Sequence, residues 1–71
     1  MFKVEIQYKD GASDTFDSVT SIGISMAPSY RKLTDDEIRT LKFGSSKDIY
    51  IFNEKSHLIA ANTFKRLSVE G

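Results

Sequence analysis

Residues 48–70, DIYIFNEKSHLIAANTFKRLSVE, decide the fold that we predict for this chain. The four consecutive apolar residues at 49–52 predict a strand that is covered on both faces. Polar residues 53–56 then form a turn, and residues 57–61 are predicted to return as the second strand of a hairpin. We expect this hairpin to be the centre of the molecule.

The end of the chain is predicted to form one more strand after a sharp corner. Residues 62–64 interrupt the apolar pattern and indicate a single turn that redirects the chain. Apolar Leu67 and Val69 then alternate with polar residues, which predicts a strand over residues 65–70. The corner is similar to that of SH3-like and Sm-like small barrels, a similarity that is confined to the turn and rests on no invariant motif.

The beginning of the chain carries the clearest strand pattern. Apolar and polar residues alternate from residue 2 to residue 9, which predicts an antiparallel strand with one buried face. Asp10 and Gly11 favour a tight hairpin turn. The returning strand is predicted over residues 13–17 and continues to Met26, with Gly23 marking a bulge or a bend.

Pro28 predicts a loop over residues 27–32, because proline lacks the amide hydrogen that a central strand needs. A short helix is predicted next, over residues 35–43. Thr34 and Glu37 have the spacing of a capping box, and Gly44 has the place of a left-handed residue that ends a helix. The buried side of this helix is predicted to hold Ile38, Leu41 and Phe43.

These elements together predict an α+β fold that is mostly β. We expect a small, strongly bent antiparallel sheet or a partly open barrel of about five strands, with one short helix at about residues 35–43. The 71 residues are expected to form a single domain over residues 1–71. Because a strand begins at Phe2 with no leader pattern before it, we also expect the chain to be complete.

The composition disfavours several classes of partner. Ten basic and ten acidic residues give a formal net charge of zero, whereas proteins that neutralise phosphates usually carry a basic excess. The same neutrality permits self-association.

No apolar run approaches the roughly 18 residues of a membrane span, so no membrane partner is expected. The chain contains no cysteine, which is consistent with a reducing compartment, and we expect a cytoplasmic protein.

Catalytic and metal-binding patterns are weak in this sequence. The single histidine, His57, follows Ser56 directly, and adjacent residues of a strand point to opposite faces, which is the wrong geometry for a nucleophile and its base. Asp10, Asp14 and Asp17 lack the spacing of a calcium loop. The four glycines are scattered, so no phosphate-binding loop is formed. The sequence therefore predicts a protein that is not an enzyme and holds no cofactor or metal.

The residues that we single out for partner binding are an aromatic side chain and three cations: Tyr30, Arg31 and Lys32 in the predicted loop, and Arg66 in the last strand. Exposed loops carry function more often than the interiors of strands and helices do. We predict a small non-catalytic binding module, accessory or regulatory, that acts by protein–protein contact with a larger partner or by self-association. The alternative is a small barrel that binds nucleic acid through the ring and cations around Tyr30.

Overall fold

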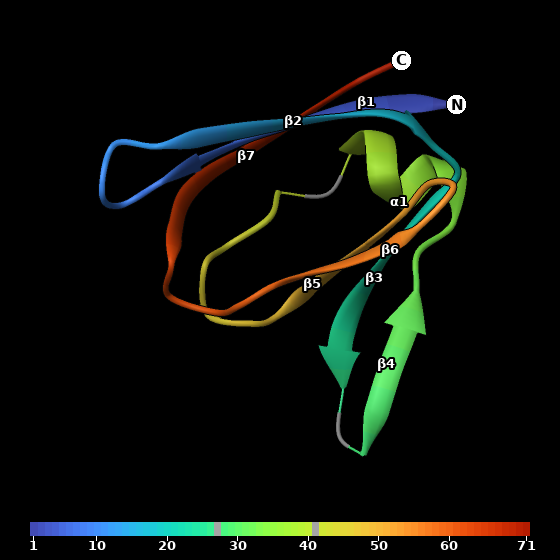
Figure 1. The fold of residues 1–71 in the computed structure, drawn as a ribbon. Helices are drawn as coiled ribbons and strands as arrows, with labels where there is room; N and C mark the ends of the chain where they lie inside the picture. The colour runs from blue at the N-terminus through green and yellow to red at the C-terminus, as the bar shows by residue number, and fades with distance from the viewer. Residues whose placement is uncertain (27, 41) are drawn as a thin grey trace.

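The computed structural model describes residues 1–26, 28–40 and 42–71. This part of the chain forms seven strands and one helix (Figure 1). In chain order they are β1 (Phe2–Tyr8), β2 (Ser13–Val19), β3 (Ser21–Met26), β4 (Ser29–Lys32), α1 (Asp35–Thr40), β5 (Ile49–Phe52), β6 (Ser56–Ile59) and β7 (Phe64–Glu70). The predicted α+β fold with mostly β structure is confirmed.

The strands form two antiparallel sheets that do not close into a barrel. One sheet has the order β2-β1-β7 and the other has the order β4-β3-β5-β6. The chain crosses from the first sheet to the second at Thr20, between β2 and β3, shortly after Ser18 near the end of β2 takes a φ of 56°. The strand that we predicted to run from residue 13 to Met26 is therefore two strands. Together with β4, this division raises the number of strands from about five to seven.

The first hairpin has the predicted turn. Gly11 has a φ of +95°, a conformation that side chains other than glycine rarely adopt, and its amide donates to the carbonyl of Tyr8 at 3.1 Å. Of the bulge or bend predicted at Gly23, the bulge is wrong, because β3 pairs with β4 and with β5 in continuous register. Gly23 has a different purpose: a Cβ atom at this position would lie 2.8 Å from Cδ2 of Tyr30, so the missing side chain makes room for the tyrosine ring.

The core lies between the two sheets and is entirely apolar in the described residues. Its largest fully buried side chains come from both sheets and from the helix: Phe64, Ile6, Ile22, Ile38, Ile49, Ile51, Val4 and Val19. The predicted hairpin at β5 and β6 thus supplies part of the centre. However, β5 is not covered on both faces as predicted, because only Ile49 and Ile51 are buried, whereas Tyr50 and Phe52 stay half-exposed.

The corner before β7 is confirmed as a turn. The amide of Thr63 donates to the carbonyl of Ala60 at 3.4 Å, and Asn62 takes a left-handed φ of 64°. The last strand begins at Phe64, one residue earlier than predicted. Phe64 is completely buried, so the residue that closes the turn is also a core residue.

Residues 29–32 form strand β4, so the loop predicted over residues 27–32 is wrong for these four residues. Pro28 lies in the turn before the strand, and residues 29–32 pair with β3 at the margin of the sheet. Proline excludes a central strand only at its own position, and an edge strand can start directly after it. Ala27, the first residue of the predicted loop, lies outside the described residues.

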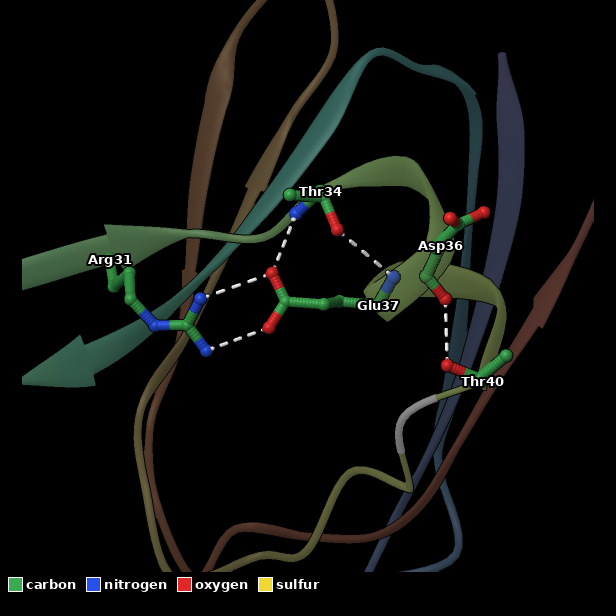
Figure 2. Close-up of polar contacts among 5 residues, drawn as sticks. All are labelled: Arg31, Thr34, Asp36, Glu37 and Thr40. Carbon is green, nitrogen blue, oxygen red and sulfur yellow. Dashed lines mark hydrogen bonds and ion pairs between the residues drawn. The ribbon is translucent and has the colours of Figure 1, made fainter.

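The helix has the predicted start and an earlier end. The amide of Thr34 donates to Oε1 of Glu37 at 3.0 Å, and the amide of Glu37 donates to Oγ1 of Thr34 at 3.2 Å, which confirms the capping box (Figure 2). Ile38 faces the core. The helix spans Asp35–Thr40, and the hydroxyl of Thr40 donates to the carbonyl of Asp36 at 2.7 Å.

The predicted end of the helix at residue 43 is therefore wrong. Phe43 lies beyond α1 in the irregular segment that leads to β5, where it packs against the core cluster. Gly44 does not have the left-handed φ expected of a residue that ends a helix. Leu41, predicted for the buried side of the helix, lies outside the described residues.

Replacing Thr34 with alanine is expected to destabilise the protein by about 1 kcal/mol, because the amide of Glu37 loses the hydroxyl to which it donates. The measurement is the free energy of unfolding from urea titration. Thr34→Ser keeps the hydroxyl and should retain most of the stability. Equal stability of Thr34→Ala and the wild-type protein would contradict the contribution of the cap.

Candidate functional site

The two sheets present chemically different outer faces. The face of the β2-β1-β7 sheet is polar: Glu5 lies opposite Thr15 and Ser68, and Gln7 lies opposite Arg66. On the other sheet, alternation along the strands buries the isoleucines and turns a different set of side chains outward. That set is Tyr30, Lys32, Tyr50, Phe52 and Leu58, which we call the aromatic face.

The side chains of the aromatic face contact one another across three strands. The rings of Tyr30 and Tyr50 are stacked, with centroids 4.7 Å apart and planes at 29°. The ring of Tyr30 also lies 5.6 Å from that of Phe52. Nζ of Lys32 lies 5.0 Å from the centroid of Phe52, within the range of a cation–π interaction. These contacts join the three rings and the cation into one continuous surface on the sheet.

The register of β3 explains why the rings meet. Tyr30 on β4 lies opposite Ser25, and Tyr50 on β5 lies opposite Gly23. The tyrosine ring reaches Tyr50 by leaning diagonally across Gly23, where no side chain stands in its way. The arrangement therefore depends on one glycine in the middle of a strand.

The aromatic face is open to solvent. Tyr30 is 38% exposed and Leu58 is 58% exposed, while Tyr50 and Phe52 are half-buried. Leu58 lies on β6, directly opposite Tyr50. Four large apolar side chains are thus continuous across the sheet, with Lys32 at one margin.

Arg31 belongs to a different environment, although it lies between Tyr30 and Lys32 in the sequence. Its guanidinium donates to both carboxylate oxygens of Glu37, at 3.1 and 3.0 Å (Figure 2). The hydrogen bond from Arg31 and the amide of Thr34 lower the pKa of Glu37 from 4.5 to about 2, and the same carboxylate raises the pKa of Arg31. Arg31 therefore fastens β4 to α1, and its charge is paired within the chain.

The ion pair predicts a dependence of stability on pH. Because the pKa of Glu37 is lower in the folded protein than the ordinary value of 4.5, its contribution is fully present above pH 4.5 and is lost as the pH falls toward 2. Glu37→Gln should therefore lower the melting temperature at pH 7 and have a much smaller effect at pH 2. Thermal melts of both proteins across this range give the test. A difference that is the same at both pH values would show that the carboxylate charge does not stabilise the fold.

The structure brings only two of the four predicted binding residues to the same surface. Tyr30 and Lys32 share the aromatic face, whereas Arg31 is paired with Glu37. Arg66 is exposed on β7, opposite Gln7, in the other sheet.

Tyr50, Phe52 and Leu58 are surface residues that our reading of the sequence missed. The aliphatic residues of β5 occupy the odd positions and its aromatic residues occupy the even positions. This separation was the available signal that one face of β5 is aliphatic core and the other is an aromatic surface.

The histidine and the aspartates have local structural contacts. The ring of His57 lies 4.7 Å from that of Phe16, and its Nε2 lies 3.2 Å from Oδ1 of Asn53. Asp10 accepts the amide of Ala12 at 2.9 Å, as a turn residue does. In the described ranges, no three His, Cys, Asp or Glu side chains are grouped so that they could hold a metal ion.

Tyr8 and Asp14 form a further local contact in the first hairpin. The hydroxyl of Tyr8 donates to Oδ2 of Asp14 at 2.8 Å. Burial, together with this carboxylate, raises the pKa of Tyr8 to about 12. Asp14 thus has a partner within the hairpin that accounts for its position.

Comparison of the chain with protein-family models, with curated proteins and with solved structures gives no match. Across residues 1–26, 28–40 and 42–71, no helix has the length and apolar character needed to cross a membrane.

Proposed function

We propose that this protein is a non-catalytic binding module, accessory or regulatory, that contacts a protein partner through the aromatic face. The observation that carries the proposal is the contrast between the two outer faces. One is polar, as expected for a solvated sheet, whereas the other exposes Tyr30 and Leu58 beside two half-buried rings. Contiguous exposed apolar surface on a small protein is typical of an interaction site.

The composition of this face is suited to protein contact. Aromatic residues are enriched at protein interfaces, because they bury a large area at a low cost in conformational entropy. Burying a leucine or phenylalanine side chain completely is worth about 1.5–3 kcal/mol, and Leu58 is still 58% exposed in the free protein. Lys32 at the margin supplies a charge that can select among partners.

Single-stranded nucleic acid is the alternative partner, and the contacts favour it less. A base needs a free ring face on which to stack, but Tyr30 and Tyr50 stack on each other and Lys32 lies over Phe52. Of the cations in the four strands of this sheet, Arg31 is already paired with Glu37, which leaves Lys32 on the aromatic face.

Site-specific photo-crosslinking in the cells of origin tests the proposal. A benzophenone amino acid is placed at Leu58, on the aromatic face, and in a matched protein at Glu5, on the polar face. We expect irradiation to join position 58 to one discrete protein and position 5 to none. Repeating the experiment with Tyr30→Ser in the position-58 protein should reduce the product strongly.

Three outcomes would contradict the proposal. They are crosslinking from position 5 that equals crosslinking from position 58, a product that is unaffected by Tyr30→Ser, and a product that contains nucleic acid in place of protein. The last outcome would support the alternative function. A cytoplasmic location stays a prediction from the sequence, and fractionation of the same cells tests it.

A further inference from the structure

Strand β4 forms an open edge of its sheet, and this edge carries an inference that rests on the proposed function. All four of its residues are exposed, and on its outer side no described strand pairs with it. The amide of Leu33 donates to the carbonyl of Ile22 at 2.8 Å, in the register in which Lys32 lies opposite Gly23. This bond identifies which residues of β4 direct their backbone groups to β3.

Backbone groups of an antiparallel strand point alternately to one side and the other. Since Leu33 bonds to β3, Arg31 and Ser29 point the same way, and the amides and carbonyls of Tyr30 and Lys32 point outward from the sheet. The amide of Ser25, opposite Tyr30, confirms the alternation because it donates to Asp48 on the β5 side at 3.0 Å. Tyr30 and Lys32 therefore offer two donors and two acceptors at the open edge.

The same two residues carry the margin of the aromatic face. The side chain of Tyr30 lies against Tyr50 and Phe52, and the side chain of Lys32 lies over Phe52. A strand added at this edge would bond to the backbone of Tyr30 and Lys32 and would place every second side chain next to theirs. A partner strand could therefore form backbone hydrogen bonds with β4 and side-chain contacts with the aromatic face at the same time.

A second copy of the chain fits this edge poorly. Symmetric pairing of Tyr30 with Lys32 of the other copy would put the two Arg31 side chains, each bonded to its own Glu37, directly opposite each other, so that like groups face like groups with no complementary contact. Pairing Lys32 with Lys32 has the same defect. Pairing Tyr30 with Tyr30 would put Lys32 opposite Pro28, which has no amide hydrogen to donate. The edge is protected against copies of itself.

An acidic strand meets none of these obstacles. We propose that β4 binds an extended segment of the protein partner in antiparallel orientation, with an acidic residue opposite Lys32 and an apolar or aromatic residue opposite Tyr30. Because the strands run in opposite directions, the segment reads acidic, any residue, apolar. The middle residue lies opposite Arg31, on the side of the ion pair with Glu37.

Titration of the isotope-labelled protein with the capped peptide TVETFTV tests the inference. Its Glu and Phe have the proposed spacing, and the amides of Tyr30 and Lys32 should show the largest chemical-shift changes. The peptide TVKTFTV, with Lys in place of Glu, should bind about tenfold more weakly at low salt. In Lys32→Glu protein, this order of affinity should reverse.

Backbone methylation provides a matched control for strand pairing. Methylating the amides of the peptide's Glu and Phe removes the donors that face β4 and should abolish binding. Methylating the Thr between them changes an amide that points away, and the affinity should stay within about threefold.

The inference is overturned if millimolar TVETFTV leaves the amides of Tyr30 and Lys32 unmoved. Equal effects of the two methylation patterns, or no reversal with Lys32→Glu, would also overturn it. Crosslinking from position 58 that persists after such a failure would leave the proposed protein contact in place and remove only the edge pairing. Dimerisation of the peptide-free protein that is lost in Tyr30→Pro would assign the edge to a second copy and contradict the inference.

Discussion

Replacing Phe64 with alanine is expected to cost about 3–5 kcal/mol of stability, the largest effect of any single truncation in this chain. Phe64 has no exposed surface and is the largest fully buried side chain among the described residues. It is the first residue of β7 and lies opposite Tyr8 of β1, where the last strand joins the first sheet. The free energy of unfolding from urea titration, followed by circular dichroism, measures the loss.

The loss is large relative to the stability of so small a protein. At about 0.05–0.15 kcal/mol per residue, a chain of 71 residues has about 4–11 kcal/mol in total, so Phe64→Ala is expected to lose a large part of its stability, and at the low end of this range it would be mostly unfolded at 37 °C. Phe64→Leu keeps most of the apolar volume and should remain folded. If Phe64→Ala melted like the wild-type protein, the corner at residues 61–63 would not be anchored by this side chain.

Ile51→Ala is expected to cost about 2–5 kcal/mol, because it opens a cavity in the layer between the sheets. Ile51 is completely buried on β5, between its partners Ile22 on β3 and His57 on β6. The matched control is Leu58→Ala on the same hairpin, where an exposed side chain should change stability by less than about 0.5 kcal/mol. Equal effects of the two substitutions would show that the hairpin does not have a buried and an exposed face.

Much of the fold could be predicted because several of its signals are local. The alternation in β1, the turn at Gly11 and the capping box of Thr34 and Glu37 each lie within a few residues. Signals of this kind depend only on backbone sterics and neighbouring side chains, so the sequence is sufficient to read them. All three are present where we predicted them.

The errors concern β4 and the end of α1. Residues 29–32 became a strand because β3 offers them a pairing edge, which overrides the loop predicted after Pro28. The end of α1 was misplaced because Gly44, which we expected to end the helix, does not take the left-handed conformation. For β4, tertiary pairing determined the local structure.

The candidate site was predicted in part for the same reason. Tyr30 and Lys32 could be selected because a loop was predicted at their position. Arg31 does not join them on the aromatic face, because it forms an ion pair with Glu37 on the helix, and the sequence alone does not show that contact. For Tyr50 and Phe52, the separation of aromatic from aliphatic positions in β5 was a signal, but it does not show whether another layer covers the aromatic side. A run of four apolar residues is equally compatible with a strand buried on both faces.

We propose that the aromatic face serves binding and not stability. Leu58→Ser separates the two roles when the free energy of unfolding and the affinity for the protein captured from position 58 are both measured. We predict a change in the free energy of unfolding below about 0.5 kcal/mol and an affinity that falls at least about tenfold. Unchanged affinity, or a loss of affinity that merely follows a loss of folded protein, would contradict the claim.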